Sequence, residues 1–314
     1  MKRLLEWIKE AEQIALLPHL RADGDALGSC YALAELIKQL KKTPYVILEE
    51  EPLMRFDYLE GDFLVFDGKI KEYDLVIAVD CSDLTRLGKR EILYRGKTAC
   101  IDHHLTCEPI GQLSYVDSDA AATAELVYQL ACEANVMTRK MGTCIYTALS
   151  TDSGSFRYSN TTPRTMRIGA ALMEMGIDTA LINRKLYEQV TMGSLRFQAE
   201  CVDKMQLFVQ NKIAITYLTM NRADELELTS DDTDGGGSIM LSILGVNVGA
   251  FFHEREPGKF KVSLRSDEAV DVAFIAKSFG GGGHLRASGY TTAGPLATAI
   301  SQLVEKIKEQ LVEL

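Results

Sequence analysis

Histidine and aspartate residues follow three short apolar runs in the first half of the sequence. They come after IALLP, DLVIAV and TACI, and they are His19, Asp23, Asp25, Asp80, Asp102, His103 and His104. Carboxylates that lie close together destabilise a fold unless protons or metal ions neutralise their charge. Imidazole and carboxylate ligands together suit Mn²⁺ and similar divalent ions. These residue types therefore predict a metal site.

The number of ligands is sufficient for two ions. A further carboxylate, that of Asp152, follows the helical pattern RKMGTCIYTALS. Taken alone, Asp152 is equally well explained as a turn residue. Two ions about 3.5–4 Å apart form the arrangement used for in-line displacement at phosphorus. We expect the first ion to bind His19, Asp23 and Asp80. We expect the second ion to bind Asp25, Asp80, His103 and Asp152, so that Asp80 bridges the pair.

The elements that would position these residues alternate between β-type and helical patterns up to about residue 190. This alternation favours βαβ units and a parallel sheet covered on both faces, with ligands at the carboxyl edge of the strands. We expect the opening segment 19–29 to be a turn that carries metal ligands. The alternative is an ordinary turn whose residues only cap the following helix. Strands are expected at 14–18, 44–49, 74–80 and 98–102, and helices at 31–40, 122–134, 139–150 and from Pro163 to Gly176.

The pattern changes after about residue 206. Segments 210–218 and 249–266 read as antiparallel strands, and 269–279 and 295–311 as helices. We therefore expect an α/β protein with an N-terminal parallel-sheet domain (1–188), a helical linker (189–205) and a smaller α+β C-terminal domain (206–314). The active-site cleft is expected between the two domains.

A second group of residues, in the C-terminal part, could bind an anion. Four consecutive glycines precede a histidine, and residues without Cβ let a ligand approach backbone N–H groups. Arginine binds a terminal phosphate through two parallel hydrogen bonds. The alternative is a loose turn after a helix. The predicted substrate-binding residues are Arg265, Ser266, Gly282, Gly283, His284 and Arg286.

Composition limits the ligands and the compartment. The net charge of −10 argues against a protein that grips long nucleic acid, which generally needs a basic face. The seven cysteines include no CxxC pair and indicate reduced thiols in the cytoplasm. No apolar run approaches the roughly 20 residues of a membrane span, so we expect no membrane contact.

Four motifs occur in the order found in one family. HLRADGD, the strand end AVD, the triplet DHH and ALSTDSGSFRYSNTTPRT resemble the DHH phosphoesterase superfamily, and RSDEAVDVAFIAKSFGGGGHLRASG resembles its C-terminal companion domain. Where the family often has proline before the first aspartate, this chain has Ala22. Within the superfamily the chain is most similar to bacterial bifunctional oligoribonucleases. These enzymes degrade RNA of about two to five nucleotides to mononucleotides and remove the 3′-phosphate of 3′-phosphoadenosine 5′-phosphate (pAp).

The resemblance implies a Mn²⁺-dependent phosphoesterase, of the exoribonuclease and bisphosphate nucleotidase type, with Mg²⁺ or Co²⁺ as alternative ions. It also implies that the C-terminal domain holds the nucleotide. The expected catalytic residues are Asp80, His104, which would contact substrate, and Asp102, which would accept a hydrogen bond from an imidazole or merely cap its strand.

Two other functions remain open. The chain could be a phosphodiesterase for cyclic or linear dinucleotides, or a nucleotide-binding regulator with a relic site, although an intact ligand set argues against a relic. A pyrophosphatase is disfavoured because its lysine- and arginine-rich C-terminal signature is missing. The sequence leaves open the native metal, the cleavage polarity and the choice between monomer and homodimer.

Overall fold

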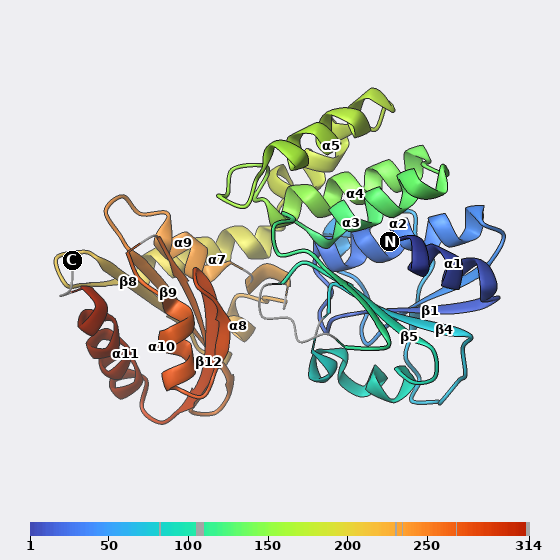
Figure 1. The fold of residues 1–314 in the computed structure, drawn as a ribbon. Helices are drawn as coiled ribbons and strands as arrows, with labels where there is room; N and C mark the ends of the chain where they lie inside the picture. Colours follow the sequence, from blue (N-terminus) through green and yellow to red (C-terminus); the bar gives the residue numbers. More distant parts are fainter. Residues whose placement is uncertain (82, 105–109, 230, 234, 268, 312–314) are drawn as a thin grey trace. The chain divides into compact units, whose positions relative to one another are not determined.

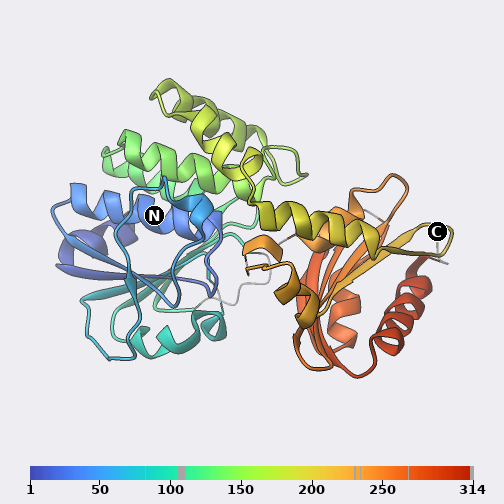
Figure 2. The ribbon, with the colours of Figure 1, turned by 180° about the vertical axis from the view of Figure 1, so that it is seen from behind.

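The computed structural model describes residues 1–81, 83–104, 110–229, 231–233, 235–267 and 269–311, and for His284 it describes the backbone alone. The chain divides into two compact units, Met1–Gln189 (unit 1) and Val190–Leu314 (unit 2). Figure 1 shows both units, and Figure 2 shows them from behind. In the described part of the chain every helix is too short or too polar to cross a membrane.

Unit 1 is built on a six-stranded sheet in the order β3-β2-β1-β4-β5-β6, and all its pairs are parallel. Chain order reverses between β1 and β4, which makes the carboxyl ends of these two strands the point where a ligand crevice opens in such a sheet. The strands are β1 Gln13–Pro18, β2 Thr43–Leu48, β3 Leu64–Val65, β4 Leu75–Val79, β5 Thr98–Asp102 and β6 Leu113–Val116.

Both faces of this sheet are covered, as buried parallel strands require. Ile14 and Leu16 of β1 point into the larger core, on the face that carries α1 to α4, whereas Ala15 and Leu17 point into a smaller core with Leu87 of the segment η2. The fold class expected for unit 1 is thereby confirmed. The helices are α1 Lys2–Glu10, α2 Gly24–Gln39, η1 Met54–Phe56, η2 Leu84–Leu93, α3 Thr123–Ala134, α4 Arg139–Asp152, α5 Pro163–Glu174, α6 Thr179–Asn183 and η3 Arg184–Glu188.

Two of the helix boundaries that differ from the expectation lie at the predicted metal ligands. Helix α2 begins at Gly24 and not near Tyr31, because the carboxylate of Asp23 accepts hydrogen bonds from the backbone amides of Asp25 (3.1 Å) and Ala26 (3.0 Å) and so caps the helix. Helix α4 continues to Asp152. Asp25 and Asp152 therefore lie on helix ends, which hold a side chain more firmly than a turn does.

Unit 2 contains a mixed sheet in the order β11-β12-β10-β9-β8-β7, in which only β8 and β9 are parallel neighbours. One core, with Phe252 and Leu264, lies between this sheet and helices α10 and α11; another, with Phe251 and Met240, lies on the other face beneath α7 and α9. The elements are α7 Met192–Asp203, β7 Gln206–Phe208, β8 Ile213–Leu218, α8 Met220–Glu225, η4 Asp231–Thr233, α9 Gly236–Leu241, β9 Val248–Glu256, β10 Lys259–Ser266, α10 Val272–Ser278, β11 Gly282–His284, β12 Ala287–Ala293 and α11 Leu296–Leu311.

Candidate active site

The predicted ligands of unit 1 gather at the carboxyl edge of the sheet, where chain order reverses. His19 follows β1, Asp80 follows β4, and His103 follows β5. Asp80 has a φ of 56°, an uncommon conformation that aspartate tolerates better than most residues. The backbone thus turns sharply at the end of β4. Asp80 is 2% exposed and Asp25 is fully buried, so both carboxylates need partners.

The three ligands predicted for the first ion form one cluster. The Nε2 atom of His19 lies 3.5 Å from an oxygen of Asp23 and 3.5 Å from Oδ2 of Asp80. The other ring nitrogen, Nδ1, donates to the backbone carbonyl of Leu20 at 2.6 Å, which leaves Nε2 as the atom directed at the carboxylates. The three potential ligand atoms lie within 4.8 Å of one another.

The ligands predicted for the second ion also come together. The Nε2 atom of His103 lies 3.1 Å from Asp152, 3.8 Å from Asp25 and 3.7 Å from Oδ1 of Asp80. Its Nδ1 donates to the carbonyl of Ala120 at 3.2 Å. A backbone carbonyl that fixes the ring in this way is the usual partner of a metal-ligating histidine. The donor set therefore fits a pair of divalent ions held between imidazole and carboxylate groups.

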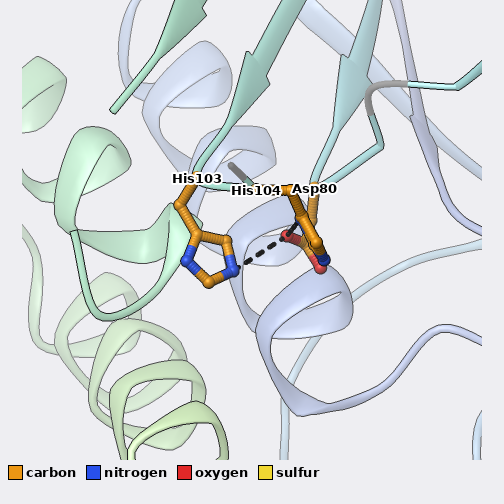
Figure 3. A group of neighbouring side chains, drawn as sticks. All are labelled: Asp80, His103 and His104. Carbon is orange, nitrogen blue, oxygen red and sulfur yellow. Dashed lines mark ion pairs between the residues drawn. The ribbon is translucent and has the colours of Figure 1, made fainter. Parts of the chain in front are cut away.

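A third group consists of Asp80, His103 and His104, and Figure 3 shows both imidazole rings beside the Asp80 carboxylate. The Nδ1 atom of His104 lies 2.7 Å from Oδ1 of Asp102 and 3.6 Å from Asp80. Asp102, which is fully buried, also accepts hydrogen bonds from the backbone amides of His103 and His104 at 2.7 and 3.2 Å. Asp102 thus fixes both the backbone of the DHH triplet and the second imidazole ring.

The charges of the cluster balance one another. Burial opposes a charge on both imidazoles, but Asp23 and Asp80 raise the pKa of His19 to about 10, and Asp152 with its neighbours raises that of His103 to about 11. Burial also raises the pKa of Asp80, but His19 and the other imidazoles outweigh it and lower this pKa to about 2. Divalent ions would replace these protons, because imidazole binds metal in its neutral form.

Close packing of α2 on α4 brings Asp25 next to Asp152. A Cβ atom at Gly28 would lie 2.5 Å from the backbone carbonyl of Cys144, and one at Gly24 would lie 2.4 Å from the side chain of Thr151. Only glycine permits this approach of the two helices. The opening motif therefore contains glycines for packing as well as residues for chemistry.

Two residues expected to bind substrate in unit 2 also make hydrogen bonds within the fold. The hydroxyl of Ser266 and the guanidinium of Arg286 both donate to the backbone carbonyl of Val270, at 2.7 and 2.9 Å. Ser266 is 5% exposed. Both residues hold the segment between β10 and α10.

The remaining residues of this group lie in one region of the sheet. Backbone pairing aligns Arg265 with Ala287, and Ala287 with His284, on three neighbouring strands. The side chain of His284 lies outside the described residues. A Cβ atom on Gly283, whose φ is 138°, would lie 2.6 Å from the carbonyl of Ala287, whereas Gly282 is exposed with open space around it. The tight β11–β12 hairpin thus accounts for Gly283, and Gly282 is the glycine accessible to a ligand.

Sequence reasoning missed the residues that hold the carboxylates. Asp25 accepts hydrogen bonds from Ser29 Oγ (2.9 Å) and from the backbone amides of Thr123 (2.6 Å) and Ala124 (3.1 Å), and the hydroxyl of Thr123 donates to Asp80 at 2.8 Å. One signal was present in the sequence. Helix α3 begins after Ala122, which cannot cap it, so a cap had to come from elsewhere in the chain.

The strand order, the clusters of histidine and aspartate and the second mixed sheet together define a two-unit α/β protein with a candidate site for two divalent ions. The chain belongs to the DHH family. The family model described as "DHH family, N-terminal domain" matches residues 13–149, and the model of the DHHA1 domain matches residues 210–313.

Related proteins align with nearly the whole chain. The Thermus thermophilus protein named "Bifunctional oligoribonuclease and PAP phosphatase NrnA" is 29% identical over 314 residues, covering 99% of this chain and 94% of that protein. The Streptococcus mutans protein named "Probable bifunctional oligoribonuclease and PAP phosphatase NrnA" is 30% identical to this chain, and the alignment covers 92% of each of the two chains.

A solved structure is similar over the same extent. The crystal structure of an exopolyphosphatase-related protein from Bacteroides fragilis has a TM-score of 0.92 and 27% identity, and it covers 98% of this chain and 95% of that one. The family and the phosphoesterase class expected from the motifs are confirmed.

Proposed function

We propose that this protein hydrolyses short oligoribonucleotides to mononucleotides and removes the 3′-phosphate of pAp, using two divalent ions. The observation that carries the proposal is the place of Asp80 beside two His/Asp clusters. Asp80 belongs to the cluster of His19 and Asp23, and its Oδ1 lies 3.7 Å from Nε2 of His103, which belongs to the other cluster. The names of the T. thermophilus and S. mutans proteins, which are similar over nearly their full length, support these two substrates.

We assign His19 and Asp23 to the first ion, and Asp25, His103 and Asp152 to the second, with Asp80 between them. Mn²⁺ is the ion we expect, because both groups contain imidazole, whereas Mg²⁺ prefers oxygen ligands and retains its waters. When bound, two such ions supply an activated water and stabilise the charge that develops at phosphorus.

The protein's own groups orient the substrate. Asp102 holds the ring of His104 through Nδ1, so the opposite nitrogen, Nε2, is the atom proposed to contact a phosphate oxygen. In unit 2 we propose that Arg265, the backbone at Gly282 and the imidazole of His284 bind the nucleotide. Ser266 would act indirectly, because its buried hydroxyl already donates to Val270, whereas Arg286 donates one of its several N–H groups to Val270 and is also proposed to bind a phosphate.

The C-terminal proposal predicts a substrate-dependent defect. Removal of the imidazole in His284→Ala should lower kcat/KM for a dinucleotide about ten- to a hundred-fold, the effect of one charge-assisted hydrogen bond. Hydrolysis of a small chromogenic phosphodiester, which needs only the metal site, should change little. Loss of both activities in a folded, metal-loaded variant would place His284 in the chemistry itself.

A product-resolved assay tests the overall proposal. Purified protein with Mn²⁺ is incubated with a dinucleotide, a five-mer, pAp and a cyclic dinucleotide, and Asp25→Ala serves as the inactive control. Mononucleotides from the short RNAs and AMP from pAp are the expected products. Rapid cleavage of the cyclic dinucleotide alone would favour the alternative phosphodiesterase, and binding without turnover would indicate a regulator.

The compartment and the binding partners are also part of the proposal. We place the enzyme in the cytoplasm, where its seven cysteines would stay reduced. Its partners are then its substrates, short RNA and nucleotide bisphosphates, and the acidic net charge of −10 disfavours a grip on long nucleic acid.

A further inference from the structure

Thr123 contacts both carboxylates that are central to the candidate site. Its hydroxyl donates to Oδ1 of Asp80 at 2.8 Å, and its backbone amide donates to Oδ2 of Asp25 at 2.6 Å. Thr123, like Asp25, has no exposed surface, and Asp80 is 2% exposed. Water therefore does not compete for these hydrogen bonds, and the two carboxylates are tied together through one residue.

The hydrogen bond to Asp80 leaves room for ions on that carboxylate. An ionised carboxylate has about four lone-pair positions, two on each oxygen. Oδ2 of Asp80 faces His19 at 3.5 Å, whereas Oδ1 faces His103 at 3.7 Å. A bridging role would use one position on each oxygen, and the Thr123 hydroxyl occupies a second position on Oδ1. The hydroxyl thus restricts rotation of the carboxylate without blocking either side.

Thr123 is itself held in place by surrounding structure. It is the first residue of α3, and Asp25 provides the cap that Ala122 cannot provide. Two residues further into the helix, the buried carboxylate of Glu125 accepts hydrogen bonds from Thr165 Oγ1 at 2.6 Å and from the guanidinium of Arg164. The start of α3 is therefore fixed from two sides, which is what a residue that orients a ligand requires.

We propose that Thr123 is a positioning residue that orients Asp80 to bridge the two ions and joins it to Asp25. This inference rests on the proposed two-ion function. Partners that hold metal ligands from behind typically change metal affinity or activity 10- to 100-fold when they are removed. The same magnitude is expected here for loss of the hydroxyl.

The test compares Thr123→Val, which removes the hydroxyl and keeps the shape, with Thr123→Ser, which keeps the hydroxyl. Mn²⁺ stoichiometry and affinity are measured by calorimetry, and magnetic coupling between the two ions by electron paramagnetic resonance. Thr216→Val is the matched control, because Thr216 is equally buried but donates to the carbonyl of Cys201 in unit 2. These readouts do not depend on turnover.

The valine variant should bind at least one Mn²⁺ about 10- to 100-fold more weakly, with altered coupling. The serine and Thr216→Val variants should bind as the wild type does. Two ions bound to Thr123→Val with wild-type affinity and coupling would overturn the inference, whereas a wild-type protein that binds fewer than two ions would overturn the proposed function. If Thr123→Val does not fold, Thr123→Ala replaces it. If neither variant folds while Thr216→Val does, the hydroxyl of Thr123 is required for folding, and this result also overturns the inference.

Discussion

Alanine in place of Gly28 tests whether the packing of α2 on α4 sets the spacing of the ligands. The added Cβ would lie 2.5 Å from the backbone carbonyl oxygen of Cys144, whereas ordinary contacts begin at 3.4 Å. The difference, 3.4 − 2.5, is about 0.9 Å, and neither helix backbone can bend away locally as a flexible side chain would. Asp25 lies about one turn before Gly28, and Asp152 ends the helix that carries Cys144.

Two opposing terms set the expected change in stability. Overpacking of a core costs about 1–3 kcal/mol, and the change from glycine to alanine inside a helix contributes about 1 kcal/mol of stabilisation. The net effect should be a loss of up to about 2 kcal/mol in the free energy of unfolding. The effect on activity should be larger, because a misplacement of about 1 Å in a catalytic site can cost about 100-fold in rate.

Gly169→Ala is the matched control for this experiment. Gly169 is a buried glycine in the helix α5, and its Cβ would meet only ordinary contacts, the ring of Phe156 at 3.6 Å. This variant should be stabilised and fully active. Urea unfolding, Mn²⁺ titration and dinucleotide hydrolysis are compared for both variants. If Gly28→Ala matches Gly169→Ala in all three, helix packing does not determine the distance between Asp25 and Asp152.

Three further predictions concern the ligands, the metal and pH. Asp80→Ala should abolish turnover and weaken both ion sites; two tightly bound ions with even about a tenth of wild-type kcat/KM would contradict the bridging assignment. Mn²⁺ should support faster turnover than Mg²⁺ at equal free concentration, and equal rates would count against imidazole ligands. Burial, with the charges of Arg255 and Lys261, lowers the pKa of His253 from 6.5 to about 4. The unfolded chain therefore binds this proton more tightly, and the contribution of His253 to stability falls as the pH drops from 6.5 toward 4, by up to about 2 kcal/mol between pH 7 and 5. His253→Gln should remove that part of the pH dependence in urea titrations.

The sheet of unit 1 could be predicted because its signal is local. Strands buried on both faces are short continuous apolar runs, and each of the runs ending at Pro18, Val79 and Ile101 is followed directly by a histidine or an aspartate. Parallel connection then places the carboxyl ends of these strands at one edge. Residue types and topology together were sufficient to bring His19, Asp80 and His103 into contact.

The helix boundaries and the side-chain hydrogen bonds of the site could not be predicted in this way. The start of α2 at Gly24 depends on the cap by Asp23, which competes with an equally plausible turn. The bond from Thr123 to Asp80 joins residues that are 43 positions apart, and no local pattern marks it. In unit 2, no pattern in the sequence marks the hydrogen bonds that Ser266 and Arg286 both donate to the carbonyl of Val270.

The charge balance of the site would allow this chain to fold before any ion binds. Buried carboxylates as close as Asp25, Asp80 and Asp152 would repel one another if nothing compensated them. Protonated imidazoles on two sides and the backbone amides at the start of α3 supply that compensation. The amides would remain if ions replaced the protons, and they would hold Asp25 in the same position. Burial and the neighbouring carboxylates also raise the pKa of Asp25 and Asp152, so the protons that ions would replace lie on carboxyl groups as well as on histidine. The groups that would stay are the backbone donors, so the fold and the metal site can share the same carboxylates.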